Sequence, residues 1–431
     1  MKGKAFKTIR SISVALLATM VAVGIALRGL LTPPSMPAAV VAFTGLAQPG
    51  LAVATGVQLH RAFVAHGSVV SLVDTTTARI ISSTPVRGEP LALALDRPRQ
   101  QLFVASYADS MLNVLDARSG QPVRMLTLPL YPTHVAFDDA AGLAIVSGYN
   151  AASTTQIMAT ISLATGAILH TVNLGAGPFG ATGSATVVVD QRTHHVFITT
   201  VQGVEVLDTR TGAYVQHILI AAGGPPDDIV ISPLSERVFV TLQGTTPTAG
   251  QCVAVRCPTI GRGVVALDAR GGHVVWRVPL GTRGASLCAL TVDDRTGHIF
   301  VADRCDDDQG QGRVYMLDAR RGTVLSTTSV STGPYALATD PQRGHVVTVG
   351  RGGIDVLDAQ SGAQLTTMPW PGNAVVVDEH SGRAVVVSTF DYQWTRNKVA
   401  NTLLGFVRTS SSRIGLNHHD FGGISIVRIS P

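Results

Sequence analysis

Two short polar runs in the sequence carry the residue types that bind metal ions. Three aspartates at 306–308 are followed by Gly310 and Gly312, and carboxylates in such a loop are ligands for Ca²⁺. The run lacks the alternating spacing and terminal glutamate of an EF-hand loop, which favours a solvated acidic loop. The His-His-Asp run at 418–420 offers imidazole and carboxylate groups, but adjacent side chains of an extended loop point apart. The sequence therefore predicts no cofactor, with a structural calcium ion as the alternative.

The four cysteines all lie between positions 252 and 305. Cys252 and Cys257 share one predicted connection, while Cys288 precedes and Cys305 follows a predicted pair of strands whose register brings them to the same end. Because oxidising compartments favour pairing of an even set of cysteines, we predict one disulfide between Cys252 and Cys257 and one between Cys288 and Cys305. A four-thiolate metal site is the alternative, which is disfavoured because the spacing lacks two C-x-x-C knuckles.

Familiar catalytic motifs are missing from the sequence. There is no G-x-S-x-G elbow and no H-E-x-x-H pair. The stretch GAGPFG at 175–180 fits G-x-G-x-x-G, but no helix follows it, so a dinucleotide site is excluded. His194 and His195 fall in a short predicted turn and are interpreted as surface residues. No residue is therefore predicted to be catalytic.

The positive charge of the chain is concentrated at its N-terminus. The formal charge of +5 equals the charge of five basic residues among the first 28, namely Lys2, Lys4, Lys7, Arg10 and Arg28. The remainder is close to neutral, which argues against a nucleic-acid partner. The apolar run at 11–27 behind these charges is typical of a signal peptide or signal anchor, and the proline-rich stretch at 33–37 resembles a stiff tether.

The N-terminal pattern predicts where the protein resides. No cysteine precedes Cys252, so a lipid-modified N-terminal cysteine is excluded. We expect residues 1–37 to be the signal segment with its tether and residues 38–431 to be the folded domain. The domain is predicted to lie outside the cytoplasm, either membrane-anchored or secreted, and to contact the membrane through the N-terminal segment only.

An internal repeat determines the expected fold. The segment LNVLDARSGQPVRML recurs as VEVLDTRTGAYVQHI, VVALDARGGHVVWRV, VYMLDARRGTVLSTT and IDVLDAQSGAQLTTM, with two weaker copies. Each copy is an alternating apolar run, a turn and a second alternating run, which is typical of a β-hairpin. The turn aspartate accepts backbone hydrogen bonds, and the glycine takes a positive φ. The weaker copies place Ala78 at the glycine position and Ala164 at the aspartate position, which predicts less well-defined turns there.

A second motif precedes each hairpin and completes a four-stranded unit. Examples are TVVVDQRTHHVFITT and LTVDDRTGHIFVAD, in which a turn separates two very apolar runs. Four-stranded units, with strands A to D, that repeat at this spacing predict an all-β fold, a single β-propeller of antiparallel blades. The C-terminal GGISIVRIS lacks a following strand, and the run from Ala38 to Phe43 is expected to complete that blade and close the ring. This arrangement gives eight blades, with seven as the alternative.

The VLD-x-x-[ST]-G hairpin, followed by P-x-x-[AV]-x-D and [VF]-[FV]-V, resembles bacterial surface-layer-type YVTN/YncE-like β-propeller repeat proteins. The resemblance covers about residues 48 to 431. It implies an exported binding or structural module, and it transfers no functional residue, because that family is defined by its scaffold.

The connections between strands B and C are long in four units, at 147–156, 243–262, 303–311 and 388–422. Insertions on one face of a repeat fold usually mark the binding face. We therefore expect a monomeric, non-catalytic binding or scaffold module whose partner is a protein, a glycan or a small ligand. The alternative is a propeller hydrolase or lyase with a metal at the central channel, for which His134, Asp227 and Asp228 are the polar candidates. A surface-layer or stalk component that self-associates is the third hypothesis.

Overall fold

The computed structural model describes residues 38–45, 50–56, 60–77, 79–150, 155–176, 186–220, 225–244, 261–281, 287–303, 311–331, 333–378, 380–388 and 423–429. Within these ranges the chain forms 32 β-strands and no helix, so no membrane-spanning helix occurs in them. The N-terminal segment, the polar runs at 306–308 and 418–420 and three of the cysteines (Cys252, Cys257 and Cys305) lie outside the described residues.

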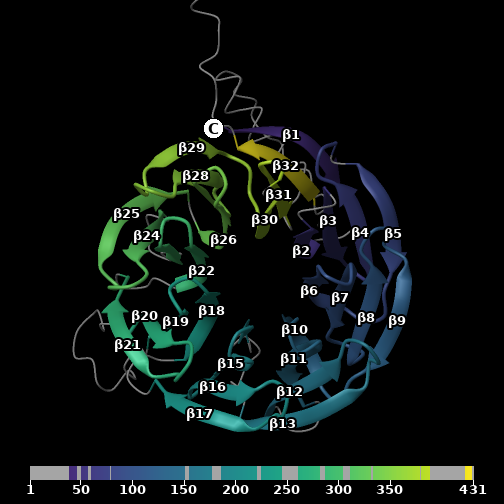
Figure 1. Cartoon of the computed structure of the whole chain (residues 1–431). Helices are drawn as coiled ribbons and strands as arrows, with labels where there is room; N and C mark the ends of the chain where they lie inside the picture. Colours follow the sequence, from purple (N-terminus) through teal and green to yellow (C-terminus); the bar gives the residue numbers. More distant parts are fainter. Residues whose placement is uncertain are drawn as a thin grey trace, which may run out of the picture. The chain divides into compact units, whose positions relative to one another are not determined.

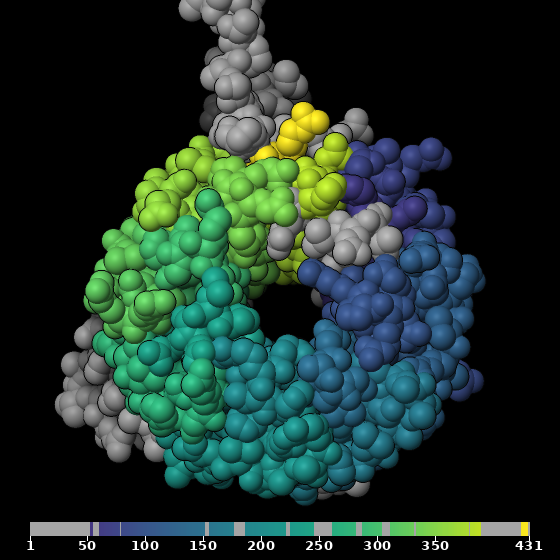
Figure 2. All heavy atoms as spheres, viewed as in Figure 1, coloured from purple at the N-terminus to yellow at the C-terminus, as the bar shows by residue number. Residues whose placement is uncertain are grey.

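The strands form eight four-stranded antiparallel sheets, arranged as the blades of a propeller around a central channel (Figures 1 and 2). Blades 1 to 4 consist of β2(Gly50–Gly56), β3(Arg61–His66), β4(Val69–Asp74) and β5(Ile80–Pro85); β6(Pro90–Asp96), β7(Gln101–Ser106), β8(Met111–Asp116) and β9(Pro122–Thr127); β10(Tyr131–Asp138), β11(Leu143–Tyr149), β12(Thr155–Ser162) and β13(Ile168–Ala176); and β14(Val187–Asp190), β15(His195–Thr200), β16(Gly203–Asp208) and β17(Tyr214–Leu219). Blades 5 to 7 consist of β18(Pro226–Ser232), β19(Arg237–Leu242), β20(Gly263–Asp268) and β21(Val274–Pro279); β22(Leu287–Asp293), β23(His298–Asp303), β24(Gly312–Asp318) and β25(Val324–Val330); and β26(Pro334–Asp340), β27(His345–Gly350), β28(Ile354–Asp358) and β29(Gln364–Met368). The predicted fold class is confirmed, and the blades number eight rather than seven.

Blade 8 joins the two ends of the described chain. Its strands are β30(Ala374–Asp378), β31(Arg383–Ser388), β32(Gly423–Ile429) and, as the outermost strand, β1(Ala38–Gly45). β1 pairs antiparallel with β32, with Ala38 opposite Ile429 and Gly45 opposite Gly423. The predicted closure by an N-terminal strand is therefore confirmed, and the strand runs two residues beyond Phe43.

The repeated turn between strands C and D follows the predicted chemistry. In blade 2 the Asp116 carboxylate accepts hydrogen bonds from the Ser119 hydroxyl at 2.7 Å and the Ser119 backbone N–H at 2.8 Å, and these bonds lower the pKa of Asp116. Gly120 has a φ of 73°, which explains the glycine in the motif. In blade 3 the hydrogen bond from Gly166 N to Ser162 O shows that Ser162, and not Ala164, holds the aspartate position. Ala78 lies outside the described residues.

The hydrophobic core is divided into layers that lie between neighbouring blades. Phe63 and Leu72 of blade 1 pack with Leu102 and Val104 of blade 2, and all four are essentially inaccessible to solvent. Five of the largest fully buried side chains are phenylalanines on second strands of blades, Phe63, Phe103, Phe197, Phe239 and Phe300. Burying each contributes roughly 1.5–3 kcal/mol. A blade therefore buries its faces only against its neighbours, which explains why the ring closes.

Buried aspartates at the ends of strands A connect adjacent blades at two joints. The Asp138 carboxylate of blade 3 accepts a hydrogen bond from Thr209 and lies 2.8 Å from the imidazole Nδ1 of His194, both in blade 4. Asp378 of blade 8 makes the corresponding contacts with Thr75 at 2.7 Å and His60 at 3.4 Å in blade 1. The interpretation of His194 as a surface residue is therefore wrong, because its ring is a partly buried contact between blades.

Candidate functional site

The wall of the channel is formed by the first strand of each blade, which is the innermost strand of its sheet (Figure 1). In blades 1, 2, 3, 5, 6 and 7 this strand begins with a β-bulge in its pairing to the second strand. A bulge adds residues to one strand and re-aims their side chains. Thr133, Cys288 and Tyr335 occupy such positions, and blade 5 has two, Asp227 and Asp228.

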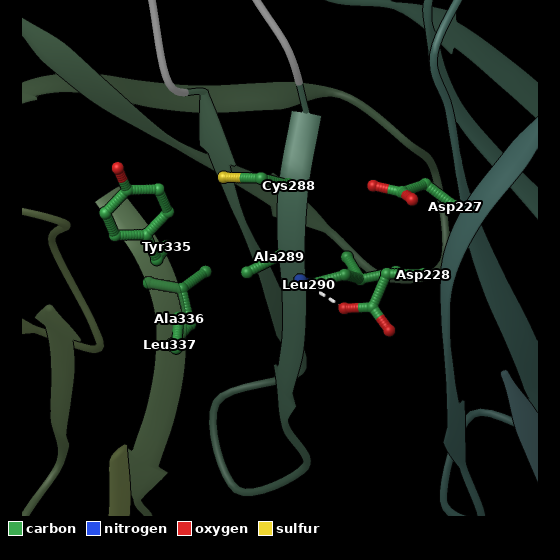
Figure 3. A pocket seen from close by; sticks show the side chains of 8 residues that line it. All are labelled: Asp227, Asp228, Cys288, Ala289, Leu290, Tyr335, Ala336 and Leu337. Carbon is green, nitrogen blue, oxygen red and sulfur yellow. Dashed lines mark hydrogen bonds between the residues drawn. The ribbon is translucent and has the colours of Figure 1, made fainter. Parts of the chain in front are cut away.

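Bulge residues of three consecutive blades line one pocket of about 270 Å³. Blade 5 contributes Asp227 and Asp228, blade 6 contributes Cys288 with Ala289 and Leu290, and blade 7 contributes Tyr335 with Ala336 and Leu337. Figure 3 shows the side chains of Asp227 and Cys288 on neighbouring strands at the same level of the channel wall. The pocket thus combines two carboxyl groups, a thiol and a phenol with apolar walls.

Asp228 is held by the backbone of its own blade and of the next one. Its carboxyl group accepts hydrogen bonds from the backbone N–H of Leu290 and of Ile229, both at 2.9 Å (Figure 3 shows the first). Burial raises the pKa of Asp228 to about 7, and the neighbouring Asp227 adds to the rise. This carboxyl group therefore exchanges its proton near neutral pH, and it can donate as well as accept hydrogen bonds.

Asp227 is anchored differently. Its carboxylate accepts a hydrogen bond of 2.6 Å from the side-chain amide of Gln243, whose own backbone carbonyl accepts one of 3.2 Å from the Arg262 guanidinium. Thr186 of blade 4 donates to the backbone carbonyl of Asp227 at 3.0 Å. Gln243 and Arg262 stand at the two ends of a long connection between strands B and C, so the pocket is tied directly to that connection.

Cys288 and Tyr335 complete the far side of the pocket. The Cys288 thiol lies 2.8 Å from the backbone carbonyl oxygen of Pro334, at the junction of blades 6 and 7. Cys305, its predicted disulfide partner, lies outside the described residues, as do Cys252 and Cys257. Both disulfides therefore stay predictions.

His134 lies on β10, the innermost strand of blade 3, but it does not line the pocket. Its ring lies 3.3 Å from the Thr133 hydroxyl, and burial lowers the pKa of His134 to about 4, so the imidazole is neutral at physiological pH. Of the three polar candidates, the structure thus brings Asp227 and Asp228 together and leaves His134 apart. The described part of the chain contains no cluster of three or more His, Cys, Asp or Glu side chains able to hold a metal ion.

Sequence reasoning missed Tyr335 as a pocket residue and assigned Cys288 only to a disulfide. A signal was present, because each follows the residue that opens a first strand, Pro334 or Leu287. In blade 5, Asp227 likewise follows Pro226, the residue that opens its first strand. Aligning the first strands of the blades would therefore have shown that Asp227, Cys288 and Tyr335 occupy equivalent positions.

The fold and the pocket define a β-propeller with a polar site at the mouth of its channel. A protein-family model described as outer membrane protein assembly factor BamB matches residues 234–389, somewhat over a third of the chain. No curated protein matches. The finer resemblance to YVTN/YncE-like repeats stays a prediction.

Solved structures with the same fold have diverse descriptions. BamB from Moraxella catarrhalis is 14% identical, with 91% of this chain and 99% of that chain covered and a TM-score of 0.58. Sqt1 from Saccharomyces cerevisiae is 9% identical, with coverages of 80% and 94% and a TM-score of 0.61. Dihydro-heme d1 dehydrogenase NirN in complex with DHE is 15% identical, with coverages of 84% and 72% and a TM-score of 0.58. At these identities the likeness shows the fold alone.

Proposed function

We propose that this chain is an extracytoplasmic β-propeller, membrane-anchored or secreted, that binds a partner protein over the mouth of its channel. The observation that carries the proposal is the position of the pocket beside the long connections. Strand pairing places Pro226 opposite Leu242 and Leu287 opposite Asp303, and the connections at 243–262 and 304–311 leave from Leu242 and Asp303. The pocket and the described ends of these two connections therefore lie on one face, which is the usual arrangement of a binding face.

The similarity to an assembly-factor family supports a protein as the partner. In this arrangement the loops supply contact area, and the pocket accepts one polar side chain of the partner, which Asp227 and Asp228 hold by hydrogen bonds. The apolar lining from Ala289, Leu290, Ala336 and Leu337 excludes water around those bonds and strengthens them.

Site-specific photo-crosslinking tests the proposal in the source organism. Tyr335→p-benzoylphenylalanine places the probe in the pocket, and Leu325→p-benzoylphenylalanine places it on β25 at the other end of the sheets, where Leu325 is 47% exposed. We expect a discrete protein adduct from the first position that disappears in Asp227→Asn/Asp228→Asn, and none from the second. Equal adducts from both positions, or none from the pocket, would contradict binding at the channel mouth.

A phosphatase reporter fused behind residues 1–37 tests the compartment separately. Phosphatase activity that is lost on deletion of residues 11–27 is the expected result. An inactive reporter would contradict export. It would not affect the conclusion from crosslinking, which concerns the binding site.

An acid–base enzyme is the second candidate, and the raised pKa of Asp228 favours it. Enzymes tune carboxyl groups towards the operating pH when these groups must both give and take protons. This hypothesis predicts an activity that depends on a group titrating near pH 7 and disappears in Asp228→Asn. The binding proposal requires no such activity.

A further inference from the structure

A groove of about 540 Å³ lies between blades 3 and 4, on the outer side of the ring. It is lined by Asn173 and Gly175 of β13, Gln202, Glu205 of β16, and Tyr214 and His217 of β17, among others. In the pairing of β16 with β17, Glu205 stands opposite His217 and Leu207 opposite Tyr214. Paired residues share a face of a sheet, and Leu207 packs in the layer against blade 3. Glu205, His217 and Tyr214 therefore all face blade 3.

Glu205 is a buried acid with unused hydrogen-bonding capacity. The residue is only 4% exposed, and one carboxyl oxygen, Oε1, contacts Nδ1 of His217. The other oxygen, Oε2, is buried and has no hydrogen-bond partner. Burial raises the pKa of Glu205, and His217 only partly opposes the rise. A buried polar atom without a partner is costly, so its presence calls for an explanation such as a bound ligand or a water molecule.

The blade 7 equivalent shows how this position is satisfied when it is purely structural. Asp355 lies three residues before its turn aspartate, as Glu205 does, and it is paired with Thr367 on the outermost strand. Its carboxylate accepts hydrogen bonds from Thr367 at 2.6 Å, from Gln364 at 2.7 Å and from the Ser331 backbone at 2.8 Å. Blade 4 has His217 where blade 7 has Thr367.

Tyr214 takes the place of Gln364, and its hydroxyl group bonds to blade 3 and not to the carboxylate. Its hydroxyl donates a 2.7 Å hydrogen bond to the backbone carbonyl of Asn173 in blade 3. The bond fixes the ring across the groove while 52% of the residue stays exposed. The substitution therefore removes a donor from Glu205 and presents an aromatic wall to an incoming group. The His217 side chain contacts Glu205 and is 39% exposed, so it has room to move towards solvent.

We propose that this groove binds an arginine side chain of a partner protein. The guanidinium stacks against the Tyr214 ring and donates two hydrogen bonds to the Glu205 carboxylate, while His217 moves towards solvent. Arginine fits better than lysine, because a planar guanidinium both stacks on an aromatic ring and matches a carboxylate with two parallel bonds. A metal ion fits poorly, since the described residues offer no group of three His, Cys, Asp or Glu side chains at this position. The groove is independent of the channel-mouth pocket.

Histidine NMR with a capped arginine tests the proposal. The full chain carries ¹³C-labelled histidine, and the His217 signal is assigned by its loss in His217→Gln. Titration with N-acetyl-arginine amide is expected to shift that signal saturably in the millimolar range, whereas the neutral isostere N-acetyl-citrulline amide has no effect. Glu205→Gln is expected to weaken binding by about tenfold or more, because a charge-assisted bond is lost. Tyr214→Ala weakens it less, by about threefold to tenfold.

Asp355→Asn is the matched control in blade 7, and it leaves the titration unchanged. Thermal melting of each variant verifies that the ring is folded, and Tyr214→Ala serves as the test if Glu205→Gln does not fold. The proposal would be overturned by any of four results. These are a saturable shift with capped citrulline, an equal affinity for capped lysine, an unchanged affinity in Glu205→Gln, and the absence of any shift with capped arginine.

Discussion

Blades 4 and 7 place an acidic residue at the same point of the repeat, and the two carboxylates have opposite surroundings. Asp355 of blade 7 is enclosed by donors from Ser331, Gln364 and Thr367. Glu205 of blade 4 is equally buried, yet it has His217 as its partner and leaves one oxygen unsatisfied beside a groove. The repeat therefore fixes the position of the side chain, but the neighbours on the outermost strand decide whether the group stabilises the fold or remains open to a ligand.

The largest effect is expected from truncating the satisfied carboxylate. Asp355→Ala leaves the donors of Ser331, Gln364 and Thr367 without their acceptor, and it is expected to cost about 3 kcal/mol in free energy of unfolding. Glu205→Ala removes a hydrogen-bond partner only from the half-exposed His217, and it is expected to lower the free energy of unfolding by less than about 1 kcal/mol. Denaturant unfolding of both variants measures the difference, and equal losses would show that the comparison between the blades is wrong.

A third buried carboxyl group extends the comparison to the channel. The folded state raises the pKa of Asp228 from 3.8 to about 7, so it favours the protonated form. The stability contributed by this group is present below about pH 4 and is lost as the pH rises through about 7. Asp228→Asn is therefore expected to be more stable to unfolding than the wild type by about 1–2 kcal/mol at pH 8, where the wild-type carboxyl group must ionise in a buried position. Unfolding curves at pH 4 and pH 8 test this, and the same stability difference at both pH values would contradict it.

The smallest effect is expected when two residues of blade 4 are replaced by the residue types found at the equivalent positions of blade 7. Tyr214→Gln/His217→Thr supplies Glu205 with the two side-chain donors that Asp355 has, and it is expected to add about 0.5–1 kcal/mol of stability at pH 7. The same variant should no longer bind capped arginine, which ligand-observed NMR of the capped arginine measures without the His217 signal. If the variant is more stable but still binds arginine fully, then the missing donors of Glu205 are not what allows the groove to bind arginine.

The fold was predictable because the repeat records both the strand pattern and the turn chemistry. The VLD-x-x-[ST]-G hairpin and the leftover strand at GGISIVRIS together predicted eight blades and the closure by residues from Ala38 onwards, and both are confirmed. Ala164 was assigned to the wrong position because its turn uses Ser162 in place of aspartate, which weakens the motif.

The sites were predictable only in part, because they depend on contacts between blades. Asp227 and Asp228 stood out as adjacent acids near the axis, whereas Tyr335 reaches the same pocket only because two bulges align around the channel. Glu205 reads in the sequence as one residue of an alternating strand. Its missing donors become visible only when Tyr214 is seen to bond to blade 3 instead.

The pairing of β1 with β32 also sets the order in which the protein can be assembled. Among the described strands, β1 is synthesised first and its partner β32 after all the others, so β1 stays an unpaired edge strand until β32 is made. Such a distant contact makes ring closure a late and slow step. The nascent chain is therefore most exposed to misassociation through β1 and the open face of blade 1 until β32 has been synthesised and can pair with β1.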